Sequence, residues 1–283
     1  MTCPYCKAQT PLIGRGFRVT KRRGKAQRYQ CKRCNRTFTQ KTLVTGMWYD
    51  EETVAGVLLL HLEGVTELDI ADFLGVCWRT VERWLEKFGN LLNKICSRFK
   101  PATCNTLHSD ELFLKLLHRF LYVWDSCTKD SKWLTIRPSL KRNSKSAEHL
   151  LQESPRPLEA NVTDGAFSYT EPVRKVHGRQ VKHIVATDDH KYLNNFIEGV
   201  QSTIRRFTRP RRGFKRIHKA VNHLRRYQHY HNFIKNNVGL GNKPPAVRLG
   251  FVHYPNKANK KQRILHLLNQ ALSFWQKIKH RLC

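Results

Sequence analysis

The chain has 283 residues, 40% of them hydrophobic and 10% aromatic, so it is long enough for about two globular domains and too apolar to be disordered. Its 52 lysines and arginines exceed its 21 aspartates and glutamates, which gives a formal net charge of +31. Such a charge attracts polyanions, so nucleic acid is the expected partner. The sequence has no run of 18 apolar residues and no signal-peptide core after Met1, so we expect a cytoplasmic protein that spans no membrane.

The acidic residues are confined to the middle of the chain. No Asp or Glu precedes Asp50, and none follows Glu198. This uneven placement disfavours the alternative of a generically basic protein. It leaves the carboxylates where a metal-using catalytic segment would need them.

Four of the nine cysteines form two Cys-x-x-Cys pairs within residues 1–46, the first predicted domain. The pairs are Cys3 with Cys6 and Cys31 with Cys34, and a β-hairpin fits the stretch between them. Two such pairs place four thiolates around one tetrahedral ion, a geometry and ligand type that zinc favours. An odd cysteine count without a secretory signal argues against a disulfide framework. We expect a structural zinc ribbon with a basic, DNA-contacting surface, and a redox-active pair is the alternative.

Residues 47–100 predict a helix-turn-helix domain. A short helical pattern over 67–76 and a second over 78–85 are separated by a turn at Gly75. The expected core consists of Leu68, Ala71, Leu74, Val76, Val81, Trp84 and Leu85. The side chains expected to enter a DNA major groove are Arg79, Thr80, Arg83 and Lys87. A plain helical linker is the alternative interpretation.

Residues 101–240 change to an alternating pattern. The expected strands are 107–115, 120–124, 133–136, 160–165 and 183–186, and the expected helices are 144–152, 169–176, 193–207 and 214–234. The resulting order, β-β-β-α-β-α-β-α-α, is that of a ribonuclease H-like α/β domain. The fold class is therefore α/β, with the zinc ribbon and the helical domain in front of it.

Three carboxylates are the candidate catalytic residues. Asp110 lies inside an otherwise apolar strand, where an unpaired carboxylate is costly. Asp164 ends a second strand, and Glu198 lies on a flank of the helix over 193–207. Carboxylates converging from two strands and a helix can hold two Mg²⁺ or Mn²⁺ ions about 3.5–4 Å apart for in-line displacement at phosphorus. Spacing alone leaves this set open.

Other charged residues receive different predictions. Beyond Glu198, a basic track is expected to grip DNA phosphates through Arg205, Arg206, Arg209, Arg211, Arg212, Lys215 and Arg216. Glu111 points to the opposite strand face from Asp110 and is expected to be solvated or to support the ligands indirectly. Asp125 and Asp130 are expected to be surface acids in or near a hairpin turn, and Asp188 and Asp189 to be turn or N-cap acids.

The last predicted segment, 241–283, is a basic tail with an amphipathic helix. Its apolar residues include Ile264, Leu267, Leu268, Ala271 and Trp275 at helical spacing. We expect this helix to pack on the catalytic domain or on another subunit.

Four motifs together resemble the DDE transposases of bacterial and archaeal insertion sequences, most closely the insertion-sequence-six type. They are Leu107-His108-Ser109-Asp110-Glu111, Thr163-Asp164-Gly165 with Tyr169, Asn194-Asn195 with Glu198, and Arg205-Arg206 followed by Thr208-Arg209-Pro210 and Gly213-Phe214-Lys215. The interval from Asp164 to Glu198 is 198 − 164 = 34 positions, and Arg205 lies seven after Glu198, as in that family. The stretch 125–129 and the helix beyond about 256 depart from its pattern.

The resemblance implies that Asp110, Asp164 and Glu198 form the catalytic triad. It also implies Mg²⁺-dependent cleavage at terminal inverted repeats, strand transfer into target DNA by a 3′-hydroxyl, and a homodimer or larger multimer in a synaptic complex. The expected location is then the prokaryotic cytoplasm, in association with the nucleoid. Two alternatives are kept: a catalytically silent DNA-binding regulator derived from a transposase, and a ribonuclease H-like nuclease that cuts without joining.

Overall fold

The computed structural model describes residues 3, 5, 6, 11–20, 24–39, 49–186 and 195–281. The chain divides into two compact units, Met1–Gly56 and Val57–Cys283. Within the described ranges, no helix has the length and apolar character that crossing a membrane requires. The finer division into four domains stays a prediction.

The first unit contains a small antiparallel sheet, in the order β1 (Leu12–Thr20), β2 (Gly24–Cys31) and β3 (Thr37–Thr39). The β1–β2 register shifts between Gly14 and Phe17, and Gly16 has φ 69° there, in the left-handed region that glycine tolerates. This sheet supplies the hairpin expected between the cysteine pairs. Because a three-stranded sheet buries little apolar surface, this unit needs a further source of stability.

Three helices follow, α1 (Glu51–Leu62), α2 (Glu67–Leu74) and α3 (Trp78–Cys96). The side chain of Thr66 caps α2 by accepting a hydrogen bond from the backbone N–H of Asp69. Gly75 ends α2 with φ 63°, a left-handed conformation that lets the chain turn at once into α3. The predicted helix, glycine turn and second helix are therefore all present.

The prediction that Leu68 belongs to the helix-turn-helix core is wrong. Leu68 is 61% exposed, whereas Ile70, which the prediction omitted, is fully buried beside Ala71. The inward stripe of α2 runs through positions 67, 70, 71 and 74, spaced three and four residues apart, and Leu68 lies off that stripe. Leu74 and Val76 are half-buried, and Val81, Trp84 and Leu85 are buried as expected.

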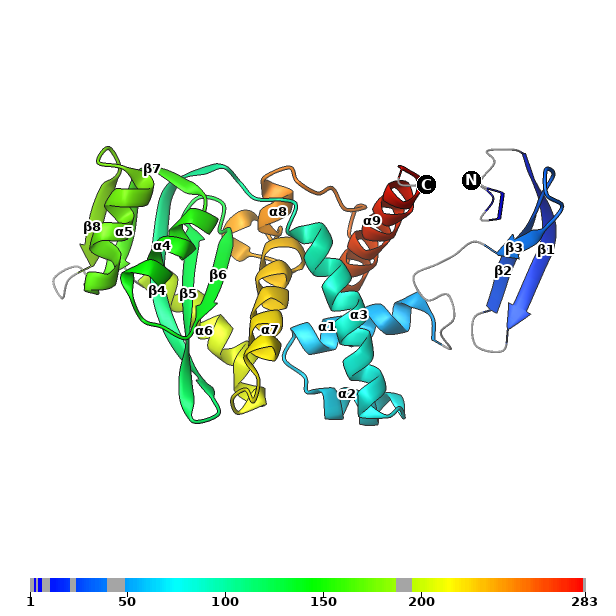
Figure 1. Cartoon of the computed structure of the whole chain (residues 1–283), viewed down its shortest axis with the longest axis horizontal. Coiled ribbons are helices and arrows are strands. Elements are labelled where there is room, and N and C mark those ends of the chain that lie inside the picture. Colours follow the sequence, from blue (N-terminus) through cyan, green and yellow to red (C-terminus); the bar gives the residue numbers. More distant parts are fainter. Residues whose placement is uncertain are drawn as a thin grey trace. The chain divides into compact units, whose positions relative to one another are not determined.

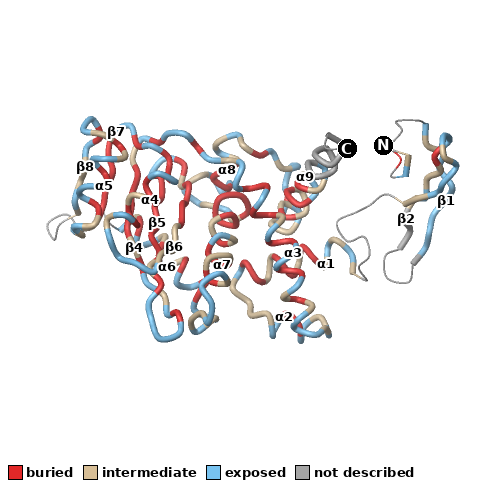
Figure 2. Tube along the Cα trace, viewed as in Figure 1, coloured by how far each residue is buried: buried red, intermediate tan, exposed pale blue. Residues whose placement is uncertain are grey.

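The centre of the second unit is a five-stranded mixed sheet in the order β6-β5-β4-β7-β8 (Figure 1). Its strands are β4 (Thr103–Leu116), β5 (Arg119–Thr128), β6 (Leu134–Ser139), β7 (Arg156–Asp164) and β8 (Lys182–Ala186). Strands β4, β5 and β6 pair antiparallel, whereas β7 pairs parallel with β4 and with β8. Buried residues run along β4 and β5, which form the middle of the sheet (Figure 2).

Helices cover both faces of this sheet. On one face, α4 (Ser144–Glu153) and α5 (Phe167–His177) form a core with Trp124, whose ring centroid lies 5.5 Å from that of Tyr169. On the other face lies α6 (Asn195–Thr208), which contacts β4 and β5, followed by α7 (Ile217–His229) against β6. The predicted order β-β-β-α-β-α-β-α-α and the ribonuclease H-like fold class are confirmed.

The remaining elements are short turns and one long helix. A 3-10 turn (Arg209–Arg211) follows α6, a π-helical turn (Tyr230–Ile234) extends α7, and a second 3-10 turn (Val238–Leu240) precedes α8 (Pro245–Arg248). The predicted helix over 214–234 thus begins only at Ile217. Positions 193 and 194 of the other predicted helix, together with Asp188 and Asp189, lie outside the described residues.

The C-terminal helix α9 (Lys260–Arg281) packs against α3. Its residues Ile264, Leu267, Leu268 and Ala271 are buried, as its amphipathic pattern predicted. The side chain of Trp275 lies outside the described residues. The expectation that this helix packs on the catalytic domain or on another subunit is corrected, because it packs mainly on α3 of the helical region, with a smaller contact to the turn Tyr230–Ile234.

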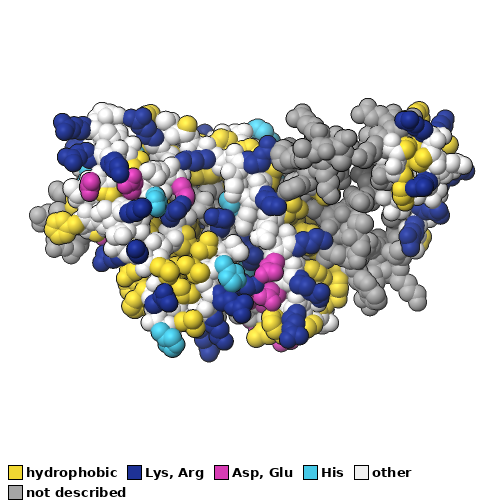
Figure 3. Space-filling view, in the orientation of Figure 1, with side chains coloured by type: hydrophobic (Ala, Val, Ile, Leu, Met, Phe, Trp, Pro, Cys, Tyr) yellow, Lys and Arg dark blue, Asp and Glu magenta, His cyan; other side chains and the backbone are white. Residues whose placement is uncertain are grey.

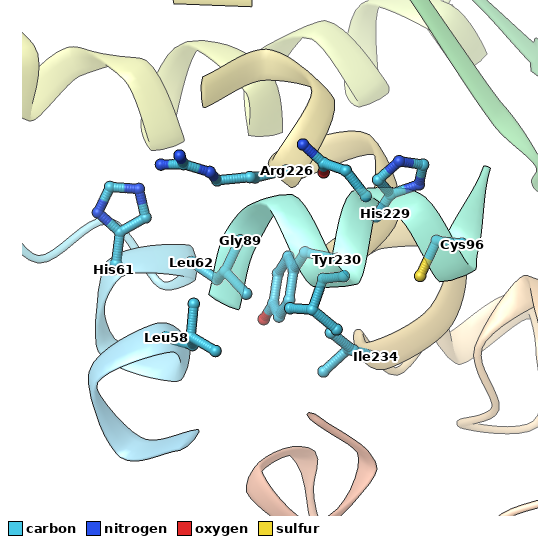
Figure 4. A pocket seen from close by; sticks show the side chains of 11 residues that line it. Leu58, His61, Leu62, Gly89, Cys96, Arg226, His229, Tyr230 and Ile234 are labelled. Carbon is cyan, nitrogen blue, oxygen red and sulfur yellow. The ribbon is translucent and has the colours of Figure 1, made fainter. Parts of the chain in front are cut away.

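The helical region is also tied to α7. A Cβ atom added to Gly89 of α3 would lie 2.5 Å from Nε of Arg226, so only glycine allows this close approach (Figure 4). Lys219 of α7 forms ion pairs with Glu82 and Glu86 of α3. Helix α3 is thus held from two sides, by α7 and by α9.

Candidate active site

The register of the central sheet brings two of the predicted carboxylates together. In the parallel pair of β4 with β7, Ser109 lies opposite Thr163, so Asp110 and Asp164 come next on neighbouring strands. Carboxylate oxygens of Asp110, Glu111 and Asp164 all lie within 4.8 Å of one another. This cluster at the end of β7 fits a divalent cation, because hard cations take carboxylate oxygens.

The environment of Asp110 disfavours an isolated negative charge. Its Oδ1 accepts a hydrogen bond of 2.7 Å from the backbone N–H of Glu111, and this contact favours the ionised form. Burial, together with the charges of Asp164, Glu111 and Glu198, raises the pKa of Asp110 to about 7. A bound cation would supply positive charge and so reduce the repulsion among these carboxylates.

Glu198 lies on the first turn of α6 and is exposed. Its charge contributes to the raised pKa of Asp110, after burial and the charges of Asp164 and Glu111. It is not among the three residues whose oxygens lie within 4.8 Å of one another. The structure therefore brings Asp110 and Asp164 together and leaves Glu198 nearby.

The prediction that Glu111 is solvated is wrong. Its side chain is only 5% exposed, and Oε1 accepts a hydrogen bond of 2.6 Å from Nε of Arg142. Burial raises the pKa of Glu111, against the lowering effect of Arg142. The side chain does lie on the α4–α5 face, as strand alternation predicted, but the helices and Arg142 exclude water from it.

The prediction that Asp125 is a surface acid near a turn is also wrong. Strand β5 continues past Trp124 to Thr128, which places Asp125 directly across from Asp110 and fully buried. Burial, and next the charge of Asp110, raises the pKa of Asp125 well above its ordinary value. Asp130, by contrast, is exposed in the following turn, as predicted.

A buried amide connects Asp125 to helix α6. Gln201 donates from Nε2 to Oδ1 of Asp125 over 3.2 Å, and its Oε1 lies 3.4 Å from Nη2 of Arg205. Gln201 lies one turn after Glu198 and one turn before Arg205 on the same helix. This contact therefore sets how α6 lies on the strand pair, and with it the positions of both exposed side chains.

A cationic pocket lies beyond the carboxylates along β4. It is lined by Leu114, Lys115, Arg205, Thr208, Arg209, Arg212, Gly213 and Phe214. Gly213 has φ 108°, and a Cβ atom there would lie 3.1 Å from the carbonyl oxygen of Lys115. Backbone hydrogen bonds of Phe214 with Lys115 and Leu117 hold this segment against the strand. Four cations around one hollow suit a phosphate group.

Arg211 does not belong to this basic track. It is 13% exposed, forms an ion pair with Glu67, and donates from Nη2 to Nδ1 of His61 over 2.8 Å. Burial lowers the pKa of His61 well below its ordinary value, so the imidazole is neutral and Nδ1 can accept. Arg211 thus fastens the turn after α6 to α1 and α2, whereas Arg206, Lys215 and Arg216 are exposed as predicted.

The predicted DNA-reading face of α3 is open to solvent. Arg79, Arg83 and Lys87 are exposed and Thr80 is half-buried. The guanidinium of Arg79 lies 5.5 Å from the ring centroid of Trp78, and Nη2 of Arg83 lies 3.4 Å from the hydroxyl of Thr80. These contacts keep the cations along one side of the helix.

The four N-terminal cysteines form a second candidate metal centre, in the first unit. The sulfurs of Cys3 and Cys34 lie 3.6 Å apart, as do those of Cys6 and Cys31. A disulfide needs about 2.05 Å, whereas sulfurs bound at about 2.3 Å around one tetrahedral zinc ion lie roughly 3.8 Å apart. Burial opposes ionisation of Cys3, but backbone N–H groups of Cys6 and Tyr5 bring its pKa below the ordinary value. The donors therefore fit zinc.

A mixed sheet with adjoining carboxylates at a strand end and a helix on each face defines a ribonuclease H-like phosphoryl-transfer fold. Residues 104–237 match the family model described as a DDE domain, and residues 48–91 match the model described as a homeodomain-like domain. Residues 104–237 therefore form a domain of the DDE transposase family, and a homeodomain-like helix-turn-helix domain precedes it in the chain. A comparison with curated proteins found no significant match.

Solved structures with a similar course of the chain include retroviral assemblies. One is a simian T-cell lymphotropic virus intasome in complex with a PP2A regulatory subunit, with TM-score 0.39 and 10% identity over 68% of this chain and 76% of that chain. Another is the catalytic core domain of HTLV-2 integrase with magnesium in a dimeric form, with TM-score 0.36 and 13% identity over 56% of this chain and 99% of that chain.

Sequence reasoning missed Gln201 and Lys115 and underrated Asp125. Gln201 is a polar residue at the edge of an apolar helical stripe, and Asp125 follows an apolar strand run in which no turn residue intervenes. Both signals were present in the pattern. Only the folded structure shows that Asp125 lies across from Asp110 and that Gln201 of α6 donates a hydrogen bond to it.

We expect the contact between Gln201 and Asp125 to be testable by exchanging donor and acceptor. Gln201→Glu places a second carboxylate against buried Asp125 and should lower the free energy of unfolding by about 1–3 kcal/mol. Asp125→Asn keeps an oxygen that accepts the hydrogen bond from Gln201, so it should change the free energy of unfolding little. The double variant should recover most of the loss in urea unfolding, because the asparagine amide can donate to the new carboxylate. A double variant no better than Gln201→Glu would contradict the contact.

We expect the cysteine centre to bind one zinc ion per chain. Elemental analysis of the purified protein should find about one equivalent of zinc, and Cys31→Ser should lose it and unfold the small sheet, because metal supplies much of the stability of such units. Cys77→Ser, at an exposed cysteine outside the centre, is the matched control and should keep the metal. A metal-free protein with a folded N-terminal sheet would overturn this expectation.

Proposed function

We propose that this chain is a transposase of the insertion-sequence-six type that cuts and rejoins DNA at the terminal inverted repeats of its element. The observation that supports this most is the sequence of groups along β4 and α6. Asp110 in the middle of β4 adjoins Asp164 at the end of β7, Glu198 is near enough to affect the pKa of Asp110, and the cationic pocket lies farther along β4 and α6. Acidic ligands beside phosphate-binding cations suit phosphoryl transfer on a polyanion.

In the proposed reaction, Asp110, Asp164 and Glu198 would hold two Mg²⁺ or Mn²⁺ ions. Such ions lower the pKa of an attacking water or 3′-hydroxyl and stabilise charge on the leaving oxygen. The protein's own groups position the DNA. Arg205 and Arg209 neutralise phosphates beside the cut, and buried Gln201 holds the helix that carries Arg205 and Glu198 in place.

The remaining parts of the proposal concern recognition. Arg79, Thr80 and Arg83 of α3 would contact base edges of the terminal repeats, because the second helix of this motif lies in a major groove. The cysteine-bound zinc ribbon would add contacts through its basic surface. Two ends must be held together for joining, so the active form would be a homodimer or a larger multimer on DNA.

Strand transfer is the decisive assay. Labelled element ends and a target plasmid are incubated with Mg²⁺ and the parent protein, Asp164→Asn or Asp130→Asn. We expect joined product from the parent and from Asp130→Asn, whose acid lies exposed in a turn, and none from Asp164→Asn. Cleavage without joining would favour the nuclease. Tight end binding without chemistry, in Mg²⁺ and Mn²⁺ alike, would favour the regulator.

Two nearby arginines should behave differently. Arg209→Ala removes an exposed cation of the pocket, so we expect weaker DNA binding and a salt dependence (log affinity against log salt) shallower by about 0.9. Its unfolding free energy should stay unchanged. Arg211→Ala leaves His61 and Glu67 without their partner, and we expect it to lower the unfolding free energy by roughly 1–3 kcal/mol. Equal effects of both variants on DNA binding and on stability would contradict these assignments.

A further inference from the structure

The hairpin formed by β4 and β5 carries an exposed aromatic face. Phe113 is 64% exposed and Phe120 is 54% exposed, and their ring centroids lie 5.2 Å apart at an interplanar angle of 71°. Leu117, at the turn between the strands, is also exposed. Figure 3 shows hydrophobic side chains gathered over this part of the sheet, with lysines and arginines at the border. We call Phe113, Leu117 and Phe120 the hairpin face.

The hairpin face lies on the side of the sheet that α4 and α5 cover farther along the strands. Phe113 of β4 lies across from Tyr122 of β5, so both side chains point to the same face of the sheet. Trp124 is two residues after Tyr122 on β5 and therefore shares that face, which is the α4–α5 side. There α4 and α5 bury Trp124, and Tyr122 is half-buried against the same core. Phe113 and Phe120, farther along the hairpin, keep their rings in solvent.

Two functional clusters adjoin the hairpin face. Glu111 of the carboxylate cluster is two residues before Phe113 on β4, a rise of about 7 Å. Lys115 lies across from Phe120 and also lines the cationic pocket with Arg205. Lys115 therefore connects the cationic pocket with the hairpin face.

We propose that the hairpin face stacks on an unpaired base of the DNA strand whose phosphates lie in the cationic pocket. This inference rests on the proposed function. Each base has an apolar π-face that stacks on aromatic side chains, and cations beside the rings hold the backbone. The hairpin face would thereby keep the strands apart next to the carboxylates, which gives them access to a single phosphate.

The charges around the hairpin face favour this occupant over a second copy of the chain. Lys115 lies across from Phe120, His118 and Arg119 are exposed at the turn of the same hairpin, and Arg209 and Arg212 line the pocket that includes Lys115. A second copy also carries a formal charge of +31, so like charges would meet at such an interface. Nucleic acid offers both flat apolar rings and negative phosphates.

The test compares two DNA probes in buffer without added Mg²⁺ or Mn²⁺, so that no DNA cleavage or joining occurs and the zinc ribbon keeps its metal. One probe is a forked duplex with unpaired bases, one of them 2-aminopurine, and the other is a fully paired duplex of the same length. We expect the double variant Phe113→Ala with Phe120→Ala to bind the forked probe roughly 5- to 100-fold more weakly, while its affinity for the paired duplex is unchanged. The parent should quench 2-aminopurine fluorescence, and the double variant should not.

Two control variants separate stacking from other effects. Phe113→Trp keeps a ring and should retain the preference for the forked probe. Leu158→Ala, at another exposed apolar residue on β7, should leave both affinities unchanged. Equal losses on both probes, or none, would overturn the proposal. So would a change in the oligomeric state of the DNA-free double variant, measured by sedimentation, which would identify a copy interface instead. Failure of strand transfer by the parent would not affect this readout, because binding is measured without Mg²⁺ or Mn²⁺ and requires no cleavage or joining.

Discussion

Repulsion among carboxylates where the middle of β4 meets the end of β7 is the constraint on which the rest of the structure depends. Asp110, Glu111 and Asp164 crowd their oxygens together, and Asp125 lies buried across from Asp110. Burial raises the pKa of Asp110, Glu111 and Asp125, so the fold holds these groups in an arrangement that solvent would not favour. The acids stay close together because the backbone hydrogen bonds of the paired strands fix the positions of their Cα atoms.

The protein offsets that repulsion with few partners of its own. Arg142 pairs with Glu111, and Gln201 donates to Asp125. Neither contacts Asp110 or Asp164, which are left for cations from solution. The cationic pocket starts two turns farther along α6, so positive charge is placed beside the carboxylates without neutralising them. A site arranged in this way can take up metal ions and a phosphate backbone side by side.

Helix α6 is connected in both directions. Gln201 ties it to the strand that faces Asp110, and Arg211, in the turn after it, ties it to His61 and Glu67 of the helical region. Helix α3, which carries the predicted base-reading side chains, lies against α7 with a glycine at the point of closest approach. The helix-turn-helix and the catalytic sheet therefore share one compact unit, a short path between recognition and chemistry.

The order of strands and helices, the spacing of the cysteine pairs, and the positions of Asp110 inside one strand and Asp164 at the end of another all followed from the sequence, because alternation, helical spacing and turn residues are local signals. Leu68, Glu111, Asp125 and Arg211 did not. Leu68 lies off the buried stripe of its own helix. Glu111, Asp125 and Arg211 were assigned from their own segments, but their burial is set by partners distant in sequence, such as Arg142 for Glu111 and Glu67 for Arg211. Local pattern decided which elements form, whereas strand register and helix docking decided which charges are buried, because burial depends on contacts that only the folded chain creates.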